Sequence, residues 1–135
     1  MSKRKPVDTN LIVRYLVQDH EKHARAAGRL FEACDRGDAV IVVLPAVLAE
    51  CVFVLESFYK HARRDIASAL GMLISSPGVE IGDLAIHLDA LGRYQKTNVH
   101  FVDCLIAATA AAGGTPVATF DRNYRKFPDV RVETA

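Results

Sequence analysis

Short apolar runs alternate with longer amphipathic segments along the whole chain, and this alternation is the feature that most constrains its fold. The run AVIVV at 39–43 has the length and β-branched composition of a buried strand. Segment 22–36 carries apolar residues at helical spacing and stops at Gly37. Because strands separated by helices favour a parallel sheet covered on both faces, we expect a three-layer α/β/α sandwich with a mostly parallel central sheet of about five strands.

The other elements follow from the same patterns and from the turn residues between them. No internal repeat appears, and no linker rich in proline, glycine or serine divides the chain. A length of 135 residues therefore predicts a single domain spanning residues 1–135. Strands are expected at 6–9, 39–43, 79–81, 116–120 and 130–133, and helices at 10–17, 22–36, 45–59, 63–75, 83–97 and 101–112.

Composition excludes several classes of protein. Half of the residues are apolar and 24% are charged, which excludes a disordered chain. The net charge of +1 excludes attachment to nucleic acid by bulk charge, although 17 basic and 16 acidic residues leave room for a local basic patch. Cys34, Cys51 and Cys104 are odd in number and form no CxxC pair, so we expect reduced, mostly buried thiols in a cytoplasmic protein.

The apolar run at 39–55 is the place to look for a membrane span. It contains Pro45 and Glu50, and it is short for a helix that crosses a bilayer. A buried strand followed by a helix that begins at Pro45 explains the same residues. We therefore expect no membrane span, and the basic N-terminal segment has no apolar stretch after it that would make a signal peptide.

Four carboxylates interrupt apolar surroundings. Asp8 and Asp121 follow predicted strands, and Asp103 lies near the start of an apolar helix. Glu50 lies in a helix that is apolar almost all round, so its side chain is expected to face something inside the protein. Ligands bind outside the carboxyl ends of the strands in an open parallel sheet, and helices start at the same edge. Convergence of the four acids at this edge is therefore predicted.

Each acid also has an ordinary structural explanation. Asp8 is placed to cap the following helix, Asp103 to complement a helix dipole, and Asp121 to begin the turn in FDRN. An ion pair with Arg14 or Arg93 would account for the remaining acid.

As a set, the four acids have no matching cluster of histidine or cysteine, and oxygen ligands alone select hard cations such as Mg²⁺ or Mn²⁺. Four carboxylates exceed what one such ion needs, so the surplus would hold a second ion or orient an attacking water. This is the outline of a site that cleaves phosphodiesters.

The segments VDTN, LPAVLAECVFVL, HFVDCLIAATA and ATFDRNYRKF together resemble the PIN-domain ribonucleases, in particular the VapC-like toxins of bacterial toxin–antitoxin pairs. The resemblance covers nearly the whole chain. It implies that Asp8, Glu50, Asp103 and Asp121 form the acidic quartet of the catalytic site. Asp8 and Asp103 would be the principal Mg²⁺ ligands, and the other two would complete the pocket or a second, weaker metal site.

The resemblance also implies supporting residues and partners. Asn10 and Thr119 match polar positions that support the site. His100 and Asn123 stand where many relatives carry further acids, which puts occupancy of a second metal in doubt. The implied function is a Mg²⁺-dependent endoribonuclease acting as a toxin in the cytoplasm, with RNA as substrate, a cognate antitoxin as inhibitor and a homodimer as assembly.

Two segments, 59–64 and 121–127, concentrate positive charge beside aromatics, a combination that suits contact with an RNA backbone and stacking on unpaired bases. An ordinary solvated face is the alternative for each. His20 and His23 are expected at a solvated helix entry. The residues predicted to contact RNA are Arg14, Arg122, Arg125 and Lys126.

Two other functions fit part of the pattern. A phosphatase of the HAD type needs a second aspartate two residues after the first, and Asn10 occupies that place. A PIN-like module that binds RNA or protein without efficient catalysis would fit the departures at His100 and Asn123, but the intact quartet argues against it. Release of phosphate from small monoesters would identify the phosphatase, and loss of RNA cleavage in Asp8→Asn would support the nuclease.

Overall fold

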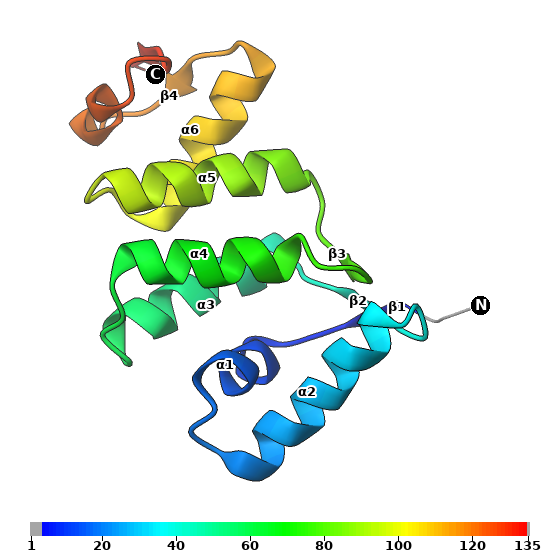
Figure 1. Ribbon diagram of the computed structural model, residues 1–135. Coiled ribbons are helices and arrows are strands. Elements are labelled where there is room, and N and C mark those ends of the chain that lie inside the picture. The colour runs from blue at the N-terminus through cyan, green and yellow to red at the C-terminus, as the bar shows by residue number, and fades with distance from the viewer. Residues whose placement is uncertain (1–3, 135) are drawn as a thin grey trace. The chain divides into compact units, whose positions relative to one another are not determined.

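The computed structural model describes residues 4–134, and the chain divides into two compact units (Figure 1). The first unit ends at Leu84 and the second begins at Ala85. Both contain fully buried apolar side chains, such as Ile41 and Leu48 in the first and Ala107 in the second. The expectation of a single domain over residues 1–135 stays a prediction.

A parallel three-stranded sheet forms the centre of the first unit, in the order β1-β2-β3. Lys5 pairs with Ile41, which pairs with Val79 on its other side. The Val7 amide donates to the Val42 carbonyl at 3.1 Å, which carries the pairing one residue beyond the first strand. The strands are β1 (Arg4–Pro6), β2 (Val40–Val42) and β3 (Val79–Glu80).

Four helices connect the strands of this sheet: α1 and α2 lie between β1 and β2 in the sequence, α3 and α4 lie between β2 and β3, and α1 contacts both α2 and α3. Pro45 opens α3, where its fixed φ suits the first helical turn. The chain leaves α2 through Gly37, whose φ of +82° is open to glycine at little cost. The helices are α1 (Thr9–Val17), α2 (Glu21–Asp35), α3 (Pro45–Ser57) and α4 (Arg63–Ile74).

The second unit consists of two helices followed by a small sheet. The last turn of α6 ends at Gly114, which has a φ of +65° and donates to the carbonyls of Ala110 and Ala111. Val117 pairs with Val132 in a parallel two-stranded sheet. The elements are α5 (Leu84–Lys96), α6 (Phe101–Gly113), β4 (Val117–Ala118), the 3-10 helix η1 (Arg122–Lys126) and β5 (Val132–Glu133).

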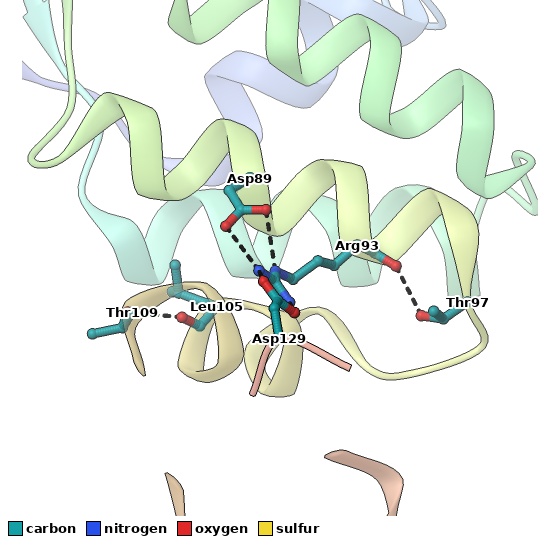
Figure 2. Close-up of polar contacts among 6 residues, drawn as sticks. All are labelled: Asp89, Arg93, Thr97, Leu105, Thr109 and Asp129. Atoms are coloured by element: carbon teal, nitrogen blue, oxygen red, sulfur yellow. Dashed lines mark hydrogen bonds and ion pairs between the residues drawn. The ribbon is translucent and has the colours of Figure 1, made fainter. Parts of the chain in front are cut away.

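Arg93 joins α5 to the segment that follows η1, as Figure 2 shows. Its guanidinium donates to Asp129 at 2.5 and 2.8 Å and to Asp89 at 3.1 and 3.2 Å. The same group lies over the Phe127 ring, 5.2 Å from the ring centre. The hydroxyl of Thr97 donates to the Arg93 carbonyl at 2.8 Å. One largely buried arginine therefore holds the C-terminal part of the unit onto α5.

The predicted fold class is confirmed, since the structure is α/β with parallel strands and each predicted helix has a counterpart. The strand expected at 6–9 lies instead at Arg4–Pro6, because Asp8 already caps α1 and Thr9 begins that helix. The number of strands in the central sheet is smaller than expected. Three strands pair in the first unit and the other two form their own sheet in the second. Strands of two or three residues offer few ladder hydrogen bonds, so the sequence does not reveal which of them pair.

Cys34, Cys51 and Cys104 are buried and none forms a disulfide, as predicted. Among residues 4–134, no helix has both the length and the apolar character needed to cross a membrane.

Candidate functional site

Asp8 lies just beyond β1 at the carboxyl edge of the three-stranded sheet and caps α1. Its Oδ1 accepts the backbone N–H of Leu11 at 2.9 Å, so the structural role predicted for it is present. The side chain is exposed. Because the cap uses only Oδ1, and Oδ2 takes no hydrogen bond from the described residues of this unit, capping and ligand binding are compatible for this carboxylate.

Cys51 on α3 shows that Asp8 and Glu50 belong to one region of the first unit. This thiol is completely buried beneath the start of α1 and interacts with the Thr9 hydroxyl. Burial, followed by the negative charges of Glu50 and Asp8, raises the pKa of the Cys51 thiol to about 12. Both carboxylates therefore act on the same atom from different elements of the unit, one at the end of β1 and one on α3.

Glu50 itself departs from the expectation for its environment. The sequence predicts that this side chain faces something inside the protein, but it is exposed, and α3 also exposes Phe53, on the same helix. The two arginines suggested as partners are engaged elsewhere, Arg14 with Asp19 and Arg93 with Asp89 and Asp129. A helix whose sequence is apolar almost all round can still have one side exposed to solvent, and Glu50 lies on that side of α3.

The second unit gathers Asp103 and Asp121 around Tyr124. Asp103 is in the first turn of α6, half-buried, and its Oδ1 accepts the Tyr124 hydroxyl at 3.1 Å. Burial raises the pKa of the Tyr124 phenol, and the hydrogen bond to Asp103 and the charges of Asp103 and Asp121 act in the same direction. Tyr124 thus orients the Asp103 carboxylate through a hydrogen bond, and its phenol also feels the negative charge of Asp121. Sequence reasoning missed this residue, although an aromatic three positions after Asp121 in a polar segment was a signal.

Asp121 starts η1, as the turn predicted in FDRN requires. Its Oδ1 accepts the backbone N–H of Asn123 at 2.8 Å, and its own N–H donates to the Thr119 hydroxyl at 2.9 Å. Thr119 therefore positions Asp121 directly. His100 is the N-cap residue of α6 and is exposed.

Arg14 lines a pocket beside Asp8 in the first unit. The pocket has a volume of about 250 Å³ and lies between α1 and α2. Asn10 is on its wall, as is His23, which sequence reasoning placed at a solvated helix entry. Its other lining residues are Asp8, Leu11, Ala26 and Ala27.

The remaining basic residues predicted to contact RNA follow Asp121 on η1. Arg122 and Arg125 are exposed. Lys126 donates its Nζ proton to the Asn98 side chain, so it is partly engaged within its own unit. In the other predicted patch, Phe58 is 75% exposed next to Tyr59, with the ring centres 4.9 Å apart. Basic groups therefore reach the surface in both segments, but Tyr124 and Phe127 of segment 121–127 are buried, so the stacking on bases predicted for that segment is not available to its aromatics.

Each unit contains two of the four predicted acids, and one oxygen each of Asp8, Asp103 and Asp121 is held by a hydrogen bond within its unit, whereas Glu50 is exposed. Carboxylate oxygens of this kind suit Mg²⁺ or Mn²⁺. Within residues 4–134, no three His, Cys, Asp or Glu side chains form a metal-binding group. The meeting of all four carboxylates in one pocket stays a prediction.

The sequence matches the model of the PIN domain family over residues 6–130, and the chain belongs to this family. It is similar to the VapC ribonuclease of Aquifex aeolicus (strain VF5), with 26% identity over 124 residues that make up 91% of each chain. These matches confirm the resemblance to VapC-like PIN proteins.

Among solved structures, the chain is similar to one in the crystal structure of VapBC2 from Rickettsia felis bound to a DNA fragment from their promoter. That similarity has 19% identity, covers 98% of both chains and has a TM-score of 0.40. The two structures do not superimpose closely, and membership of the family rests on the sequence match.

Proposed function

We propose that this protein is a Mg²⁺-dependent endoribonuclease that hydrolyses RNA phosphodiester bonds and acts as the toxin of a toxin–antitoxin pair. The observation that carries the proposal is that three of the four acids, Asp8, Asp103 and Asp121, are each oriented by a local hydrogen bond within a PIN-family chain. The similarity to a VapC ribonuclease along nine-tenths of both chains supports the reaction class.

In this proposal Asp8 and Asp103 are the principal metal ligands, and Mn²⁺ can replace Mg²⁺ because both prefer oxygen donors. A bound divalent ion supplies two things, polarisation of a phosphate oxygen and a lowered pKa of a bound water. Glu50 and Asp121 hold a second, weaker ion or orient the attacking water. The hydrogen bond from Tyr124 fixes the Asp103 carboxylate, which lowers the cost of organising the site.

Other residues of the chain bind and position the RNA in this proposal. Asn10 and Thr119 support the acidic site, the latter through the backbone of Asp121. Positive charge at the exposed start of η1 attracts the phosphate backbone. The residues proposed to contact RNA are Arg14, Arg122, Arg125 and Lys126.

The proposed biological setting is inferred from the resemblance to VapC-like toxins and not from the geometry of the structure. A cognate antitoxin protein would bind apolar helix surface and block the catalytic site, and the toxin would act in the cytoplasm as a homodimer. A short reading frame next to this one, encoding a DNA-binding protein that inhibits the nuclease, would support this setting.

Incubation of the purified protein with total RNA tests the proposal. We expect cleavage with Mg²⁺ and none with EDTA or with the Asp8→Asn and Asp103→Asn variants. Asparagine also caps helices well, so Asp8→Asn removes the charge while it preserves the start of α1. Asp65→Asn, in the first turn of α4, is the matched control and should cut RNA as the wild type does. Equal cleavage by Asp8→Asn would refute the proposed roles.

A further inference from the structure

The pocket that Asp8 helps to line combines an apolar wall with polar groups and extends from this carboxylate along α1 and α2. Leu11 lies on α1, and Ala26 and Ala27 face it from α2. Two alanines in succession leave space that larger side chains would fill, and the resulting volume is about 250 Å³. Asp8, Asn10, Arg14 and His23 supply the polar lining.

Arg14 gives the clearest sign that this pocket receives a ligand. Its Nη1 donates to Asp19 at 3.0 Å, and Asp19 in turn accepts the Tyr59 hydroxyl at 2.8 Å, so the guanidinium is held in place. Its Nε–H is buried and meets no acceptor among the described residues. Buried donors are almost always satisfied, because losing hydration without a new hydrogen bond costs free energy. An acceptor brought by a bound molecule would satisfy this one.

His23 adds a planar group whose position is also fixed. Its ring stacks on that of His20, with the ring centres 3.8 Å apart and an angle of 20° between the planes. The Nδ1 atom of His20 accepts the backbone N–H of His23 at 3.2 Å, which determines the His20 tautomer and orientation. Fixed planar rings beside an apolar wall are what proteins use to stack unpaired bases of single-stranded RNA.

We propose that this pocket binds the base of one RNA nucleotide next to the phosphate that is cut. The inference rests on the proposed ribonuclease function and adds a base preference to it. The apolar wall contacts the base, His23 stacks on it, and the Asn10 amide reads its edge because an amide both donates and accepts. The Arg14 Nε–H donates to an acceptor on the base or on the adjoining phosphate. A protein side chain fits the pocket less well than a base does, because the lining combines the unsatisfied Nε–H of Arg14, the ring of His23 and the side-chain amide of Asn10.

Filling the pocket with Ala26→Leu tests this inference. The assay measures kcat/KM on short oligoribonucleotides that vary in one nucleotide at a time around the cut. We expect the wild type to prefer one base at one position by about tenfold, the discrimination that good base contacts provide. Ala26→Leu should abolish this preference. Ala112→Leu, at an exposed alanine near the end of α6, is the matched control and should retain it.

A binding measurement separates this inference from the proposed function. The four nucleoside 5′-monophosphates are titrated into the protein while NMR follows the methyl groups of Ala26 and Ala27, and we expect one of them to shift both methyls. If the wild type cuts no RNA, the proposed function fails, while a methyl shift still supports the pocket. The inference is refuted if the wild type cuts RNA but Ala26→Leu retains the base preference and none of the nucleotides shifts the two methyl groups. In that case the pocket does not bind a nucleotide.

Discussion

Replacement of Arg93 by alanine should destabilise the protein more than removal of any exposed ion pair in it. The Arg93 side chain is 11% exposed and binds Asp129 with two nitrogens, as Figure 2 shows. It also pairs with Asp89 one turn earlier on α5 and covers the Phe127 ring. Alanine removes all of these contacts and leaves Asp129 without its partner.

The expected loss is about 2–3 kcal/mol of unfolding free energy. A charged hydrogen-bonded pair contributes roughly 1.5–3 kcal/mol, but Asp129 is 58% exposed, so solvent screening places this pair near the lower end. The contact with Phe127 adds about 0.5–1 kcal/mol and the pair with Asp89 a few tenths. An unfolding entropy of about 2.1 cal/mol/K per residue over 135 residues converts this loss into a fall in Tm of about 7–11 °C.

The same pair predicts a dependence on pH. The hydrogen bond from Arg93 lowers the pKa of Asp129 in the folded protein. A lowered folded pKa means that the stabilisation is complete above the unfolded value of about 3.9 and disappears as the pH falls through the folded value. The difference between wild type and Arg93→Ala should therefore be full at pH 7 and shrink below about pH 4.

Urea unfolding followed by circular dichroism measures both effects. Arg25→Ala is the control, because Arg25 forms an ion pair with Glu21 at 2.7 Å in which both side chains are mostly exposed. Its expected cost is at most about 0.5 kcal/mol. If Arg93→Ala costs no more than Arg25→Ala at pH 7, the reasoning from burial and bidentate geometry is wrong.

Three further changes test other parts of the structure. The three cysteines are buried and the pKa of Cys51 is about 12, so Ellman's reagent at pH 8 should find no rapidly reacting thiol until the protein is unfolded, when it should find three. Gly78→Ala should cost more than about 2 kcal/mol of unfolding free energy, since the added Cβ would lie 2.8 Å from the Ala39 carbonyl oxygen at a φ of +74°. Gly37→Ala is the control, because Gly37 has a similar φ of +82° but open space around it, and it should cost about 1 kcal/mol. Equal costs of the two changes in urea unfolding would contradict this reasoning. Tyr124→Phe should cost roughly 1–2 kcal/mol through the lost hydrogen bond to Asp103, and an unchanged Tm would contradict that contact.

The sequence predicts the elements of this fold well because their signals are local. Gly37 and Gly114 end helices through positive φ values, and Pro45 begins one. The arrangement of strands is less predictable. The strands that contain Val79 and Val132 have only two residues each, so the choice of pairing strand depends on packing between segments that are far apart in the sequence.

The candidate site is predictable in its residues and less so in its surroundings. Asp8 and Asp121 begin helical segments, and local sequence reveals this. The exposure of Glu50 depends on which side of α3 the protein covers, and an almost uniformly apolar helix does not encode that choice in its pattern. Contacts between distant residues, such as Tyr124 with Asp103 and Tyr59 with Asp19, require the tertiary structure.

The proposed function assigns Asp8 and Asp103 to one metal ion, and Mn²⁺ binding measured by electron paramagnetic resonance tests this proposal most directly. Asp8→Asn and Asp103→Asn are measured singly and together. If the two residues share an ion, each single change should weaken binding by about tenfold or more, and the double change should cost less than the two effects added. Wild-type affinity in either single variant, or fully independent effects of the two changes, would contradict the claim.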